Sequence, residues 1–165
     1  MGASDLEQTL IGGRSPRFVW GSDRGEIDSE AMAGRPLVLI FLPSLHDDSS
    51  RAYLRGFVAN KNEYGRLEAK VLVITAGLVP PTMSIPFPVI SGEPFPFEQF
   101  QLVHDEGPWA GVVIVDRYGS VAHWESEPTP DLLPSQPRVA QLLQSAESSC
   151  PECGVPEQHW LEAVR

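Results

Sequence analysis

Three segments of the chain are apolar at nearly every position, and each has the length of a β-strand. They cover residues 37–41, 71–75 and 112–115. A strand that is apolar on both faces belongs inside a mostly parallel sheet whose two faces are covered. We therefore predict an α/β domain in which these three strands share one central mixed sheet, with helices on both faces.

A helical pattern lies between the first two of these strands. Residues 49–63 carry apolar side chains at helical spacing, and the polar residues Asp47, Asp48 and Ser49 suit the exposed N–H groups of a helix start. Strand, helix and strand then form a βαβ unit. The apolar face of the predicted helix consists of Tyr53, Leu54, Phe57 and Val58.

Shorter signals complete the expected order of elements. An edge strand at residues 19–20 precedes a turn at 21–25, and we expect a short helix near 98–103. A strand at 121–124 forms a hairpin with the strand before it, and a last helix covers 136–149. The apolar face of that helix consists of Val139, Leu142, Leu143 and Ala146.

The length of 165 residues fits one domain with a substantial core. We divide the chain into an N-terminal extension at residues 1–13, the domain at 14–149 and a C-terminal tail at 150–165. The N-terminus lacks the basic stretch and apolar run of a signal peptide, so we expect a cytoplasmic protein. The apolar runs are too short to cross a bilayer.

The charge balance narrows the classes of partner. The chain has 22 acidic and 12 basic residues, which gives a net charge of −10, and its Lys and Arg residues form no cluster in the sequence. Binding to phosphate groups needs clustered basic side chains. We therefore expect no nucleic-acid and no membrane partner.

Four short segments follow one another in an order typical of one family. They are GRSPRF at 13–18, GRPLVLIFLP at 34–43, RAYLRGF at 51–57 and VIVDRYG at 113–119. Together they resemble the redoxin, or peroxiredoxin-like, family of alkyl hydroperoxide reductases and thiol-specific antioxidants. The resemblance implies a thioredoxin-like fold, with the active residue where the loop after the first buried strand enters the helix.

The resemblance also implies an active-site pattern, P-x-x-x-T-x-x-C, that this chain does not complete. Counted from Pro43, the Thr position is Asp47 and the Cys position is Ser50. Peroxide reduction requires a thiolate stabilised by the helix N-terminus and a nearby Arg. Since a serine hydroxyl cannot replace a thiolate, we predict a degenerate site without peroxidase turnover at residues 43–50.

Two interpretations of Ser50 are open. It is either a nucleophile with His46 as its base, or an ordinary residue of a helix cap. The family's second-site arginine or cis-proline falls near Ala110 in this chain, which is neither. Pro108 lies two residues away and fills the cis-proline role only if the loop is longer here.

Both cysteines of the chain lie in the tail, at Cys150 and Cys153. This C-x-x-C spacing is typical of a dithiol or of half a metal site. Three interpretations are open. The pair forms a redox-active or structural disulfide; or it binds zinc with His159 and a fourth ligand from another histidine or a second chain; or it remains as two inert thiols. We expect no cofactor unless the zinc interpretation holds.

The other imidazole and aromatic side chains give weaker signals. We expect His104 in a solvated loop, and His123 facing solvent or capping a pocket. Four phenylalanines in a proline-rich stretch either pack in the core, which is the simpler expectation, or form an exposed patch for a partner. They are Phe87, Phe95, Phe97 and Phe100.

The residues and the resemblance together predict a redoxin-like protein of the thiol–disulfide and antioxidant class. Its usual peroxidatic position is degenerate, and any redox chemistry, on the thiol or disulfide of a partner protein, depends on Cys150 and Cys153. The alternatives are a non-catalytic binding or assembly module on the same scaffold, for which a homodimer is one form, and a zinc-binding tail.

Overall fold

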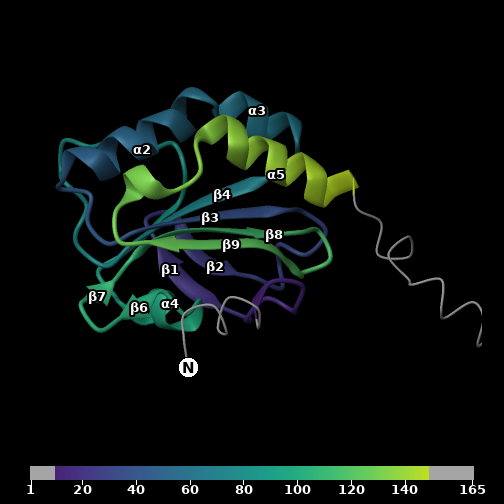
Figure 1. Cartoon of the computed structure of the whole chain (residues 1–165), viewed down its shortest axis with the longest axis horizontal. Coiled ribbons are helices and arrows are strands. Elements are labelled where there is room, and N and C mark those ends of the chain that lie inside the picture. Colours follow the sequence, from purple (N-terminus) through teal and green to yellow (C-terminus); the bar gives the residue numbers. More distant parts are fainter. Residues whose placement is uncertain (1–9, 149–165) are drawn as a thin grey trace, which may run out of the picture.

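A five-stranded mixed sheet with the strand order β5–β4–β3–β8–β9 forms the centre of the computed structural model, which describes residues 10–148 (Figure 1). Strands β3, β4 and β5 run parallel, whereas β8 is antiparallel to both β3 and β9. The prediction that the three apolar segments share one mixed sheet is confirmed. The strands are β3 (Leu37–Leu42), β4 (Lys70–Thr75), β5 (Val89–Ser91), β8 (Ala110–Val115) and β9 (Val121–Glu127).

Both faces of this sheet are covered, which explains why its central strands are apolar throughout (Figure 1). One face carries the helices α2 (Asp48–Ala59), α3 (Lys61–Arg66) and α5 (Gln136–Ser148), the last preceded by the 3-10 turn η1 (Pro130–Leu132). The other face carries the hairpin β1 (Val19–Ser22) and β2 (Gly25–Asp28), the short helix α4 (Phe95–Gln99), and the small hairpin β6 (Val103–His104) and β7 (Gly107–Pro108). None of the described helices is long and apolar enough to cross a membrane.

The alternation of side chains along β3 divides the core into two layers. Val38, Ile40 and Leu42 pack with the α2, α3 and α5 layer, whereas Leu37, Leu39 and Phe41 pack with the β1–β2 hairpin and α4. All six side chains are buried. Burial of each such side chain stabilises the fold by roughly 1.5–3 kcal/mol, so this strand is a main source of stability.

The single helix predicted at residues 49–63 is two helices in the structure. The break is at Asn60, whose φ of −104° and ψ of 16° leave the helical region and whose side-chain amide donates a hydrogen bond of 2.8 Å to the Gly56 carbonyl. Asn competes with helix interiors because its side chain bonds nearby backbone groups. The predicted apolar face is confirmed, with Leu54 and Phe57 fully buried.

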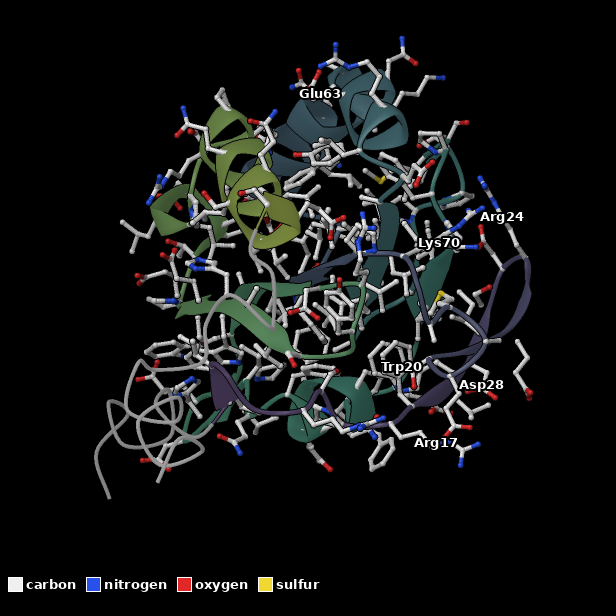
Figure 2. The ribbon with its side chains drawn as sticks, turned by 90° about the vertical axis from the view of Figure 1, so that its right-hand side faces the viewer. Arg17, Trp20, Arg24, Asp28, Glu63 and Lys70 are labelled. Atoms are coloured by element: carbon white, nitrogen blue, oxygen red, sulfur yellow. The ribbon has the colours of Figure 1, made fainter. Side chains whose placement is uncertain are left out.

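The segment before β3 is a hairpin and not a lone edge strand followed by a turn. Its strand β2 escaped prediction because it contributes only one buried apolar side chain, Ile27. Trp20, labelled in Figure 2, packs from this hairpin into the core, and its indole Nε1 donates to Gln99 Oε1 at 2.7 Å. Nearby at the surface, Arg17 lies within 4.0 Å of the Asp28 carboxylate (Figure 2).

The short helix predicted near 98–103 lies earlier in the chain, as α4. Pro94 and Pro96 occupy its cap and first turn, where a proline does not break a hydrogen bond. Gln101 ends the helical path with a positive φ of 58°. Of the four phenylalanines, Phe87, Phe97 and Phe100 are buried and only Phe95 is exposed, so the expectation of core packing is confirmed for three of them.

Candidate functional site

The loop that the family resemblance singles out runs from the end of β3 to the start of α2. Pro43 follows β3 directly, and Leu45 is fully buried beneath the helical layer, so that it anchors the loop. Thr75, at the end of β4, donates a long hydrogen bond of 3.5 Å from its hydroxyl to the Pro43 carbonyl. Sequence reasoning missed the roles of Leu45 and Thr75. The only signal for Leu45 was an isolated apolar side chain in a polar loop.

Asp47, one of the three cap candidates from the sequence, is the N-cap residue of α2. Its Oδ1 accepts a hydrogen bond of 2.7 Å from the Ser50 backbone N–H and one of 3.0 Å from the Ser49 hydroxyl. Burial raises the pKa of the Asp47 carboxyl, but hydrogen bonds from Ser50 and Ser49 together outweigh it and hold this pKa below its ordinary value. The position at which the family resemblance expects a peroxide-binding threonine is thus occupied by a charged cap.

Ser50 lies in the first turn of α2 and is only 1% exposed. Among the described residues, no hydrogen bond joins it to the ring of His46, which is exposed in the loop. A nucleophile needs both access to its substrate and a base within hydrogen-bond reach. The geometry therefore supports Ser50 as a cap residue and not as the nucleophile of a serine–histidine pair.

The second family position is apolar in this chain. Ala110 is fully buried at the start of β8, and its neighbour Gly111 pairs with Phe41 near the end of β3. Pro108 pairs with Val103 in the β6–β7 hairpin, and no cis peptide bond occurs in residues 10–148. Neither residue supplies an arginine or a cis-proline to the loop.

A groove lies beside α2, between that helix and the loop of residues 80–85, with a volume of about 530 Å³. Arg51 and Arg55 lie one turn apart on its helical side, and Arg51 pairs with the Asp48 carboxylate at 2.5 Å. The apolar part of the groove is formed by Leu54, Val58, Met83 and Ile85. The sequence pattern indicated the helix face but not the loop that completes this groove.

Two histidines have partners that the sequence did not reveal. His104 is not in a solvated loop but in β6, where its ring stacks on Trp109 with centroids 3.7 Å apart and its Nε2 lies 3.3 Å from the Ser126 hydroxyl. His123 lines a pocket between β9 and α5. This agrees with the second of its two expected positions, beside a pocket. Its Nε2 lies 3.3 Å from Glu125 Oε1.

The candidate ligands of the tail, Cys150, Cys153 and His159, lie outside the described residues. Within residues 10–148, no three His, Cys, Asp or Glu side chains are grouped so that they could hold a metal ion. This part of the chain contains no cysteine. The N-terminus of α2 is therefore capped by Asp47 and has no thiol nearby in the described part of the chain.

No protein-family model matches the chain, and no curated protein matches it. Solved structures do match. The reduced 2-Cys peroxiredoxin of Plasmodium vivax has a TM-score of 0.70 and 13% identity, over 82% of this chain and 95% of that one. The mitochondrial 2-Cys peroxiredoxin of Plasmodium falciparum has a TM-score of 0.70 and 15% identity, over 82% and 93%.

A third similar structure is the yeast mitochondrial 1-Cys peroxiredoxin, with a TM-score of 0.70 and 13% identity over 81% of this chain and 74% of that one. Identities this low establish the fold alone. The three structural matches confirm the predicted fold class: the chain has the α/β thioredoxin-like fold, in the form seen in peroxiredoxins.

Proposed function

We propose that this chain is a redoxin-like protein of the thiol–disulfide and antioxidant class that has lost the usual peroxidatic site, and whose redox chemistry depends on Cys150 and Cys153. The observation that carries the proposal is the distribution of thiols. The peroxiredoxin-like scaffold of residues 10–148 has no cysteine, and its α2 start holds Asp47 and a buried Ser50. Any thiol chemistry must therefore come from the tail pair.

The proposed reaction is thiol–disulfide exchange with a partner protein. The thiolate of one tail cysteine attacks a partner disulfide, forms a mixed disulfide and releases one partner thiolate. The second tail cysteine then attacks the mixed disulfide, closes the Cys150–Cys153 bond and releases the second partner thiolate. Two electrons and two protons pass from the tail dithiol to the partner, and the reverse reaction oxidises a partner dithiol.

Titration of free thiols in the full chain, combined with an exchange assay on oxidised glutathione, tests this proposal. We expect two free thiols after reduction, none after air oxidation, and loss of exchange in the double variant Cys150→Ser/Cys153→Ser. Ser50→Ala is the matched control at the family position and keeps wild-type exchange. Two thiols that stay free in air contradict the proposal.

The groove beside α2 favours a second candidate, a non-catalytic assembly module that forms a homodimer. Its apolar wall beside Arg51 and Arg55 is the feature that supports this candidate, because a second copy of the chain would bury it. Sedimentation velocity then shows a dimer for the wild type and a monomer for Val58→Asp. A wild type that is monomeric at all concentrations excludes this candidate.

The C-x-x-C spacing favours the zinc-binding tail as a further alternative. Zinc prefers four ligands, so Cys150, Cys153 and His159 need a fourth from His46, His104, His123 or a second chain. Metal analysis of reduced, purified protein distinguishes it: one zinc per ligand set that is lost in His159→Ala supports it, and metal-free protein after incubation with zinc excludes it.

A further inference from the structure

A second cavity lies at the end of β3 opposite to the start of α2. It has a volume of about 280 Å³ and is lined by three segments that are far apart in sequence, at residues 14–17, 29–37 and 115–119. Its apolar lining comes from Met32, Leu37 and Val115, of which the last two are paired across β3 and β8. The family resemblance assigns nothing to this end of the sheet.

Arginines gather around this cavity in an otherwise acidic chain. Arg14, Arg17, Arg35 and Arg117 line it, which is a third of the 12 basic residues in a protein of net charge −10. The two carboxylates in the lining are those of Glu30 and Asp116. The lining itself thus holds two more guanidinium groups than carboxylates, which favours an anion as its ligand.

Two of the four arginines already have carboxylate partners. Arg17 pairs with Glu30 at 3.2 Å, and Arg117 donates to the Glu147 carboxylate of α5, with its Nε at 2.9 Å. Arg14 and Arg35 form no ion pair within residues 10–148.

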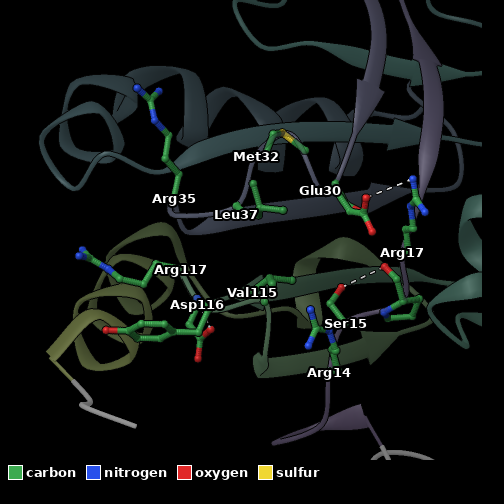
Figure 3. Close-up of a pocket in the computed structure, with 15 residues that line it drawn as sticks. Arg14, Ser15, Arg17, Glu30, Met32, Arg35, Leu37, Val115, Asp116 and Arg117 are labelled. Carbon is green, nitrogen blue, oxygen red and sulfur yellow. Dashed lines mark hydrogen bonds and ion pairs between the residues drawn. The ribbon is translucent and has the colours of Figure 1, made fainter. Parts of the chain in front are cut away.

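The remaining carboxylate, that of Asp116, is held by backbone donors. Its Oδ1 accepts hydrogen bonds of 2.9 and 3.0 Å from the N–H groups of Tyr118 and Ser120. In Figure 3, Arg35 and Arg117 extend outward at one end of the cavity, the Arg17–Glu30 pair lies at the other end, and Arg14 lies below Ser15 on the side opposite to Arg35. Within the described part of the chain, the guanidinium groups of the lining without a carboxylate partner are therefore those of Arg14 and Arg35.

We propose that this cavity binds a small organic anion, with its carboxylate or phosphate head on Arg14 or Arg35 and its apolar body against Met32, Leu37 and Val115. A guanidinium group donates two parallel hydrogen bonds to either kind of head. The volume lies just below the roughly 300–1,000 Å³ of pockets for drug-sized ligands, which limits the body to about one ring. This proposal does not rest on the thiol chemistry of the tail.

Four probes separate the two parts of the proposed ligand. Benzoate and phenyl phosphate carry both a ring and an oxyanion, benzyl alcohol carries the ring alone, and inorganic phosphate carries the head alone. Each is titrated into the full isotope-labelled chain and followed by the amide signals of Val115 and Gly119 and the methyl signal of Met32. We expect saturable binding of benzoate or phenyl phosphate, with a Kd of about 1 mM or tighter and at least about tenfold weaker binding of the two partial probes. The head group that binds more tightly identifies the carboxylate or the phosphate class.

Matched variants assign the binding to this cavity. Arg14→Gln/Arg35→Gln weakens it by about tenfold or more, and Ala33→Glu, which places a carboxylate in the same lining without removing an arginine, weakens it as well. Arg55→Gln, which removes an arginine of α2 instead, leaves the Kd within about twofold of the wild-type value. The proposal is overturned if neither organic anion saturates, if inorganic phosphate binds as tightly as phenyl phosphate, or if Arg55→Gln weakens binding as much as the double variant.

Discussion

Asp47 lies in the candidate site and also stabilises the fold, because its carboxylate accepts a hydrogen bond from the Ser50 N–H in the first turn of α2. Removing such a cap in Asp47→Ala costs about 1 kcal/mol of the free energy of unfolding, measured by urea denaturation at pH 7. Asp48→Ala is the matched control. It removes a neighbouring, exposed carboxylate whose ion-pair partner within residues 10–148 is Arg51, and we expect a smaller loss than in Asp47→Ala.

The Asp47 cap contributes to the free energy of unfolding in a pH-dependent way, and the lowered pKa gives the direction. The pKa of Asp47 is lower in the folded chain than its ordinary value of 3.8, so the folded state favours the carboxylate. Its stabilisation is complete above pH 3.8 and is lost as the pH falls through the folded-state pKa. The stability difference between wild type and Asp47→Ala therefore shrinks towards pH 2–3, and an equal difference at pH 3 and pH 7 would contradict this.

His123 changes stability in the same direction as Asp47, but at a higher pH. Burial lowers its pKa from the ordinary value of 6.5, Glu125 raises it in part, and Arg138 on α5 lowers it further. The folded state thus favours the neutral ring, so stability is complete above pH 6.5 and decreases as the pH falls below it, while the unfolded chain takes up the proton first. We predict that His123→Gln flattens this fall between pH 6.5 and 5, and that Arg138→Gln, which removes the nearby cation, flattens it in part. A wild-type profile in His123→Gln would contradict the assignment.

At the scale of elements, β8 depends on a glycine where the sheet meets the segment after α4. A Cβ atom on Gly111 would lie 2.8 Å from Leu102 Cδ2 and 3.0 Å from the Glu125 carbonyl oxygen. Since the backbone oxygen belongs to the neighbouring strand, Gly111→Ala forces the two strands or Leu102 to shift. We expect a loss of about 1–3 kcal/mol in the free energy of unfolding.

Gly21→Ala on β1 is the matched control for this prediction. No atom lies within 4 Å of a Cβ atom at that position, and its φ is not positive. Its stability should stay within about 0.5 kcal/mol of the wild type. Equal effects of the two substitutions, measured by the same denaturation experiment, would show that close packing at Gly111 is not the cause.

The elements that sequence reasoning placed well are those whose pattern is set by burial alone. The strands at Leu37–Leu42 and Lys70–Thr75 are buried on both faces, and a continuous apolar run is enough to find them. The elements it misplaced depend on local geometry. The break at Asn60 needs the side-chain bond to Gly56, and β2 is stabilised by pairing with β1 and not by its own apolar pattern.

For the whole molecule, the hydrophobic pattern predicted an α/β domain with a mixed sheet, and the family resemblance of four short segments implied the thioredoxin-like fold. The matching peroxiredoxin structures confirm both. The missing thiol could be read by counting from Pro43, because the spacing of that motif is local. The arginine-lined cavity could not be read, since Arg14, Arg35 and Arg117 come from three separate segments that only the folded sheet brings to one end of β3.

Because residues 10–148 contain no cysteine, the scaffold and the two thiols of the chain belong to different parts of the sequence. If Cys150 and Cys153 supply all thiol chemistry, the scaffold of residues 10–148 has no reactive group of its own toward peroxide. The most direct test is catalysed peroxide consumption with a thiol reductant, measured for wild type, Cys150→Ser/Cys153→Ser and Ser50→Ala. We predict that the double cysteine variant consumes peroxide no faster than the reductant alone and that Ser50→Ala matches the wild type. Catalysed consumption that survives in the double cysteine variant would contradict the central claim.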